Sequence, residues 1–154
     1  MTRIPRLASV VIMAGSVAAC ALGSGSSYVD RIATPADAKV LAWAMADFVA
    51  GRLPAGSSTV ILDPTPSAQA ANALTPAFVA ALRYRGFAVA DARQAGAPGT
   101  HRIRYLVTRL DYGDLLRVTI DGGAAEAARF MVRNTAGYLQ AGGPFTVRQI
   151  AGVN

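Results

Sequence analysis

Residues 103–120, IRYLVTRLDYGDLLRVTI, decide the fold of this 154-residue chain. Apolar side chains occupy every second position on either side of a central DYGD sequence: Ile103, Tyr105, Val107, Leu116, Val118 and Ile120. A period of two is typical of a β-strand with one buried face, and Asp and Gly are turn formers. The stretch therefore predicts an antiparallel hairpin whose apolar face must be covered by other elements.

Further strands are expected after this hairpin. Turn-forming residues at 121–123 and 134–137 flank an apolar run at 128–132, and FTVR at 145–148 predicts a last strand. The aromatic residues Tyr105, Phe130 and Phe145 are interpreted as core residues of this meander.

The segments before the hairpin are predicted to contain the helices that cover its apolar face. A helix is predicted from 35 to 50, with Thr34 as N-cap, and a short strand follows at 58–62. A second helical region at 67–85 is expected to break or kink near 74–76: either the helix kinks at Pro76, or a fresh helix starts there with Thr75 as cap. A strand that starts at Phe87 follows. The chain is therefore predicted to be an α+β protein: two helices packed on a mostly antiparallel sheet, a two-layer sandwich with one solvated sheet face.

The N-terminus is interpreted as a lipoprotein signal peptide, residues 1–19. Arg3 and Arg6 precede an apolar run at 7–17, which is shorter than the roughly 20 residues that span a bilayer. Small residues at 17–19 directly precede Cys20, the single cysteine of the chain. This pattern resembles a bacterial lipobox, which implies that Cys20 carries the lipid anchor; an ordinary signal peptide or a buried core cysteine are the alternatives.

The expected domain organisation follows from this interpretation. Residues 20–33, with a Gly/Ser-rich stretch at 21–27, are expected to form a flexible tether, and residues 34–154 a single periplasmic domain. Ala21 stands where an aspartate would signal inner-membrane retention in many lipoproteins, so the outer membrane is expected.

The sequence offers little material for catalysis. The single histidine, His101, has no acid–base partner at local spacing, and Asp111 and Asp114 are interpreted as turn residues. Since no spacing typical of a metal site occurs either, the protein is predicted not to be an enzyme and to bind no cofactor or metal.

Six arginines fall on or beside the predicted strands: Arg102, Arg104, Arg117, Arg129, Arg133 and Arg148. They are interpreted either as a solvated face opposite the core or as a basic docking face for an acidic partner. Arg117, Arg129 and Arg133 are the candidate partner contacts, and Trp43, off the apolar face of the first helix, is a possible exposed anchor. No run of four basic residues occurs, so direct nucleic-acid binding is not expected.

These pieces together resemble the family of conjugal transfer protein TrbH. The resemblance rests on the lipobox and on 58-STVILDPT-65, 77-AFVAALRYRGFAV-89 and the hairpin at 103–120. The family comprises small lipoproteins of the Trb-type mating-pair-formation apparatus, a type IV secretion system. The resemblance implies a non-catalytic envelope component, anchored in the membrane by lipid and in contact with other proteins of the outer-membrane channel. The alternative left open is an outer-membrane lipoprotein that binds or regulates a cell-wall component or enzyme.

Overall fold

The computed structural model describes residues 25–31, 34–69, 71–91 and 96–149. It contains two α-helices, α1 Pro35–Ala50 and α2 Leu74–Tyr84. The strands are β1 Tyr28–Val29, β2 Thr59–Leu62, β3 Ala88–Ala90, β4 Thr100–Leu110, β5 Gly113–Ile120, β6 Ala125–Arg133, β7 Leu139–Ala141 and β8 Thr146–Gln149. Short 3-10 turns lie at Ala55–Ser57, Ser67–Gln69 and Asp121–Gly123.

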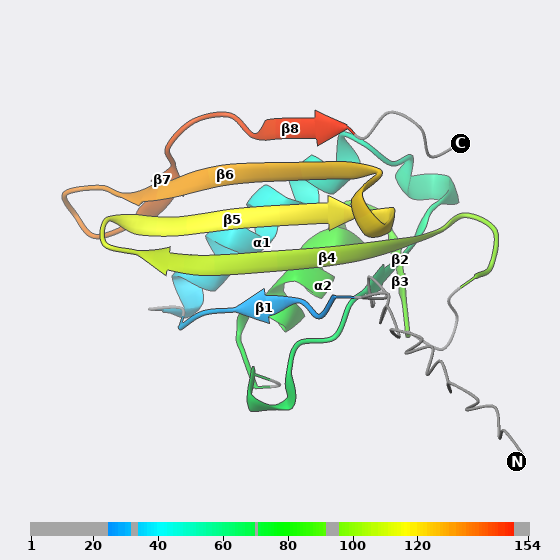
Figure 1. Cartoon of the computed structure of the whole chain (residues 1–154), viewed down its shortest axis with the longest axis horizontal. Coiled ribbons are helices and arrows are strands. Elements are labelled where there is room, and N and C mark those ends of the chain that lie inside the picture. Colours follow the sequence, from blue (N-terminus) through cyan, green and yellow to red (C-terminus); the bar gives the residue numbers. More distant parts are fainter. Residues whose placement is uncertain (1–24, 32–33, 70, 92–95, 150–154) are drawn as a thin grey trace, which may run out of the picture.

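All the strands belong to one sheet, ordered β3-β2-β4-β5-β6-β7 (Figure 1). The long strands β4, β5 and β6 pair antiparallel, as do β6 and β7. Two strands share each outer edge of this centre: β2 and β1 pair in parallel with successive halves of β4, and β8 and β7 pair with successive halves of β6. The three long strands therefore form the centre of the sheet, and short strands pair with both of its edges.

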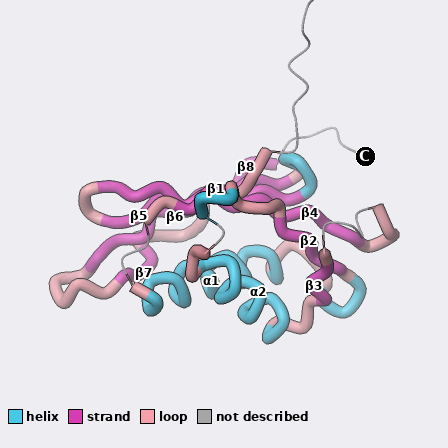
Figure 2. Tube along the Cα trace, turned by 90° about the horizontal axis from the view of Figure 1, so that it is seen from below, coloured by secondary structure: helices cyan, strands magenta, loops and turns pink. Residues whose placement is uncertain are grey.

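Both helices cover the same face of the sheet, so the molecule has two layers (Figure 2). The core between the layers holds the apolar sides of the helices and alternate residues of the strands; fully buried members include Leu41, Met45, Phe78, Leu82, Ile103, Tyr105, Leu116 and Val118. The predicted α+β class and two-layer arrangement are confirmed.

Helix α1 begins where its sequence predicts. The Thr34 hydroxyl accepts a hydrogen bond of 3.1 Å from the backbone N–H of Asp37, and Pro35 occupies the first turn, where its missing N–H costs nothing. The helix ends before Gly51.

Helix α2 confirms the expected break but has a different cap. It starts at Leu74, and the Asn72 side chain accepts the bond of 2.8 Å from the Thr75 N–H. The hydroxyl of Thr75 instead lies 2.6 Å from that of Tyr105 on β4, which gives this buried tyrosine a polar partner. The alternative with Thr75 as N-cap was wrong, because the helix already begins at Leu74 and the Thr75 hydroxyl bonds Asn72 and Tyr105 instead of a backbone N–H of the next turn.

The domain begins earlier than the predicted boundary at residue 34. Ser27 is fully buried; its N–H donates to Pro64, and its hydroxyl accepts a bond of 3.3 Å from the Tyr105 N–H. Strand β1 then pairs Tyr28 with Leu106. Residues 27–29, expected to lie in the tether, therefore belong to the folded domain, and Tyr28 and Val29 to its sheet.

Strand β6 turns the other way from the prediction. Ala127 and Met131 enter the core, whereas Phe130 is 38% exposed on the opposite face. Tyr105 is buried as expected, and Phe145 is partly buried against Phe48, with ring centroids 5.1 Å apart. The core assignment of Phe130 was wrong because alternating residues on both sides of this strand include apolar side chains, so its pattern alone does not choose a face.

Candidate functional site

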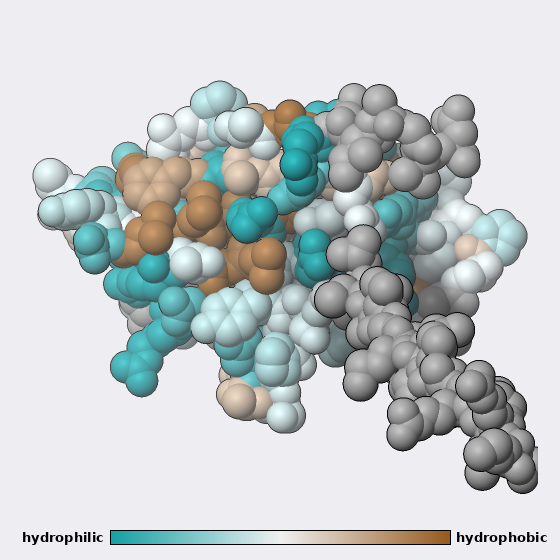
Figure 3. All heavy atoms as spheres, viewed as in Figure 1, coloured by the Kyte–Doolittle hydropathy of each residue, from teal (hydrophilic) through white to brown (hydrophobic). Residues whose placement is uncertain are grey.

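Among the described residues, no element covers the sheet face opposite the helices over β4, β5 and β6, and this face is turned to the viewer in Figure 1. Its half near the β4–β5 and β6–β7 turns is apolar, as the brown area on the left of Figure 3 shows. We call five side chains there the open-face patch: Leu106, Leu110, Leu115, Phe130 and Val132. Of these, Leu110 is 42% and Phe130 38% exposed, and the other three are half-buried. An apolar cluster on a solvated sheet face is typical of an interaction site.

Strand register brings the patch together from three strands. Thr108, Leu115 and Phe130 are direct neighbours across the sheet. The next such row is Leu110, Gly113 and Val132, where β5 runs so close to β6 that a Cβ at position 113 would collide with the Met131 carbonyl. Only glycine fits there, because any Cβ would clash with the backbone of β6.

The other half of the face is basic. Arg117 and Arg148 each donate to one oxygen of Glu126, at 2.9 and 2.7 Å. These two hydrogen bonds, from Arg148 and Arg117, hold the pKa of Glu126 below its ordinary value. Arg104 lies in the same cross-strand row as Glu126, and its buried Nε has no hydrogen-bond partner among the described residues.

Arg133 lies on the helix side of the sheet. Its guanidinium binds Asp37 at the start of α1 through two hydrogen bonds of 3.2 and 3.0 Å, and it also donates to the carbonyl of Gly137. Burial alone would raise the pKa of Asp37, but the bonds from Arg133 and Thr34 outweigh burial and lower it. Asp114, itself only 3% exposed, lies 3.8 Å from the same guanidinium. One guanidinium therefore lies close to two buried carboxylates.

Asp114 gives a prediction on pH dependence. Burial raises the pKa of Asp114 above its ordinary 3.8, although Arg109 and Arg133 oppose the shift. A raised pKa in the folded state means a contribution to stability that is present below pH 3.8 and is lost as pH rises through the folded pKa. An asparagine at position 114 does not ionise, so Asp114→Asn does not lose stability in this way. The free energy of unfolding of Asp114→Asn, relative to wild type, should therefore rise as pH increases through the folded pKa of Asp114. Urea unfolding at several pH values measures this difference.

The exposed Asp111, in the adjoining turn, provides the control for removing one negative charge. If Asp114→Asn lost stability relative to wild type as pH rises, the assignment of Asp114 as a carboxylate that folding desolvates would be wrong.

The remaining predicted arginines are also placed. Arg129 projects to the helix side of β6, and its guanidinium carbon lies 4.1 Å from the ring centroid of Phe145, a cation–π contact. Arg102 pairs with the buried Asp63 at 2.6 Å. Of the three candidate contacts, the structure thus places Arg117 on the open face and Arg129 and Arg133 on the other, in contact with the protein itself.

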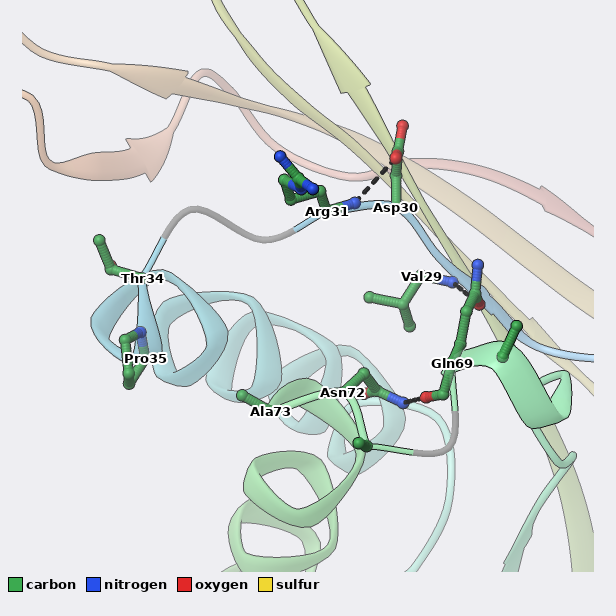
Figure 4. Close-up of a pocket in the computed structure, with 10 residues that line it drawn as sticks. Val29, Asp30, Arg31, Thr34, Pro35, Gln69, Asn72 and Ala73 are labelled. Atoms are coloured by element: carbon green, nitrogen blue, oxygen red, sulfur yellow. Dashed lines mark hydrogen bonds between the residues drawn. The ribbon is translucent and has the colours of Figure 1, made fainter.

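A hollow of about 390 Å³ lies where β1, the start of α1 and the approach to α2 meet (Figure 4). Its polar side chains are largely engaged: Gln69 accepts from the Val29 N–H, and Asn72 donates to the Gln69 carbonyl and caps α2. These hydrogen bonds join β1 to the loop before α2 along one wall of the hollow.

The helix layer carries Trp43, 37% exposed, in edge-to-face contact with Tyr84 at 5.0 Å between ring centroids. Arg85 lies over the same indole at 5.3 Å and also pairs with Asp47. The partial exposure expected for Trp43 is observed, although its partners here belong to the chain itself.

The described part of the chain has few other side chains that could act in catalysis or bind a metal. His101 Nδ1 lies 2.7 Å from Asp121, whose other oxygen accepts from the Arg102 N–H, so this pair braces the turn after β5. Within the described ranges no group of three or more His, Cys, Asp or Glu side chains could hold a metal ion. In the same residues no helix has both the length and the hydrophobicity needed to cross a membrane. Cys20 lies outside the described residues.

These features define a small two-layer α+β domain with one helix-covered and one uncovered sheet face. The family model of conjugal transfer protein TrbH matches residues 23–150, and the chain belongs to this family. The resemblance inferred from the sequence is thus confirmed, and the protein has a role in conjugal transfer. No curated protein and no solved structure matches the chain significantly.

Proposed function

We propose that the protein is a lipid-anchored, non-catalytic component of a conjugative type IV secretion apparatus, which assembles or stabilises the channel at the outer membrane. Membership of the TrbH family over residues 23–150 is the observation that carries this proposal. The uncovered sheet face, which offers a docking surface, supports an assembly role.

The anchor proposed at Cys20 would hold the domain close to the membrane. Ser27 is the first fully buried residue of the described chain, which leaves a Gly/Ser-rich link of six residues, 21–26, between it and Cys20. Such a link is expected to span about 13 Å on average. Confinement to this thin layer raises the effective concentration of the domain at partners in the same membrane.

Among the arginines proposed as partner contacts, we assign the contact to Arg117. It is 46% exposed at its side chain and borders the open-face patch. Arg133 and Arg129 contribute to the fold, because their side chains contact Asp37 and Phe145.

The test is mating frequency from a donor whose chromosomal or plasmid copy of this gene is deleted. We expect a fall of about 10²-fold or more, because the channel loses a component that acts at high local concentration, and full restoration by the wild-type gene. Unchanged transfer, with the deletion verified, would contradict the proposal and favour the cell-wall alternative.

A further inference from the structure

We infer that the open face, consisting of the open-face patch and the adjoining Arg104, Arg117 and Arg148, docks a segment of another protein that carries apolar side chains next to carboxylates. This inference rests on the proposed function, since it names the kind of partner through which an assembly component would act. In the described part of the chain the core lies between the sheet and the helices, and none of the open-face patch residues belongs to it.

The apolar half of the face has the character of a protein interface. Phe130 and Leu110 are more than a third exposed, and Leu115 lies between them and completes the surface on the central strand. The exposed Tyr112 and Tyr138 lie in the turns at the same end, where the Arg133 N–H joins the turns by donating to the Tyr112 carbonyl. Partly exposed aromatic side chains around aliphatic ones are enriched at the centres of protein interfaces.

The charges beside the open-face patch indicate which kind of partner can bind there. Arg117 and Arg148 pair with one acid, Glu126, and Arg104 lies in the same cross-strand row, so these three arginines leave an excess of positive charge beside the patch. Two copies docked face to face through this surface would bring these arginines together, and like charges in an interface are costly. Carboxylates on a different protein would instead pair with them, while apolar neighbours fill the patch.

The shape of the surface favours a protein segment over a bilayer. The patch residues lie within strands β4, β5 and β6 rather than on protruding loops, and Leu106, Leu115 and Val132 are half-buried. A strand or helix of a partner protein can lie flat on such a sheet. Insertion into a bilayer would instead require apolar side chains that project from the protein surface.

The experiment is site-specific photocross-linking of the full-length protein in donor cells that carry the complete transfer system. A photoreactive phenylalanine replaces Thr108, an exposed residue in the row of Leu115 and Phe130; the matched control replaces Lys39, an exposed residue of α1 on the helix layer. We expect an adduct at position 108 with another protein, whose cross-linked peptide, identified by mass spectrometry, contains Asp or Glu beside apolar residues.

Charge reversal then tests the role of the arginines. Arg117→Glu together with Arg148→Glu should lower the yield of the position-108 adduct about tenfold, as expected when charges in an interface are made repulsive. Arg83→Glu, at the exposed C-terminal turn of α2, makes the same kind of change on the helix layer and should leave the yield unchanged. Circular dichroism of the purified variants verifies that each remains folded.

Four results would overturn the inference: an adduct with a second copy of this chain, an adduct with phospholipid, a partner peptide without acidic residues, or no position-108 adduct in cells that transfer DNA. A reduction by Arg83→Glu equal to that of the double variant would also contradict it. These outcomes are separate from the proposed role in conjugal transfer, which deletion of the gene tests on its own through the mating frequency.

Discussion

Arg133→Met is expected to lower the free energy of unfolding by about 3 kcal/mol, because removing one partner of a buried ion pair leaves the other charge without compensation. The carboxyl groups of Asp37 and Asp114 are both almost fully buried, and the Arg133 guanidinium is close to both. Methionine retains most of the apolar stem of arginine, so the change removes the charge with little change in packing. Urea unfolding at neutral pH measures the effect.

Arg117→Met is the matched control, since it makes the same substitution on the next strand. Arg117 also pairs with one carboxylate, Glu126, at 2.9 Å, but its side chain is 46% exposed. The expected cost is about 0–1 kcal/mol, the range of solvent-exposed pairs. The double variant Asp37→Asn with Arg133→Met should recover part of the loss; equal costs for Arg117→Met and Arg133→Met would contradict the structural role of Arg133.

This contrast also separates fold from function among the arginines. A transfer defect in an Arg133 variant would accompany a loss of stability, whereas Arg117→Glu is expected to impair docking in a folded protein. Mutagenesis guided by the sequence alone would treat these residues as equivalent, because they are the same type of residue on neighbouring strands.

Much of the fold follows from local signals. Thr34 and Pro35 mark the start of α1 through interactions within a single helical turn, and the alternation at 103–120 predicts the β4–β5 hairpin within a few residues. Pro76 correctly indicates that the helical region before α2 is broken. Each of these features depends on neighbours in the chain, which a sequence displays directly.

The open-face patch was not predictable in the same way. On β6, one side carries Arg129, Met131 and Arg133, and the other carries Phe130 and Val132. Both sides contain apolar residues, so the alternation alone does not show which side faces the core. The choice of face depends on pairing with β5 and on Asp37, which is 96 residues from Arg133 in the chain. Likewise, two-residue strand β1 has no periodicity, and its place is fixed by contacts with β4.

The sequence did contain one usable signal for the site. Leu106 and Leu115 interrupt the polar positions of the hairpin, on the side opposite Tyr105 and Val118. Two leucines on the solvated face of a hairpin already indicate an interaction surface, because they lie on the side away from the core. The register shows that Phe130 and Val132 extend the same surface across β6.

Cys20→Ser is expected to release the protein from the membrane fraction and to lower mating frequency by about 10²-fold or more, the gain in effective concentration that a tether can supply. Its free energy of unfolding should equal that of wild type, because the described fold starts beyond position 20 and is held by Ser27 and the strands that follow. Fractionation of donor cells, mass spectrometry of the N-terminal peptide and mating assays measure the three effects.

Ala21→Asp is the matched variant for the choice of membrane, because it retains the cysteine and places an inner-membrane retention signal directly after it. If the anchor must lie in the outer membrane, Ala21→Asp stays lipidated, moves to the inner membrane and lowers transfer as Cys20→Ser does. If any membrane suffices, Ala21→Asp transfers at the wild-type frequency while Cys20→Ser does not. An unmodified Cys20 in wild-type membranes would contradict the anchor itself, and the open face would then have to find its partner without the concentration that a membrane provides.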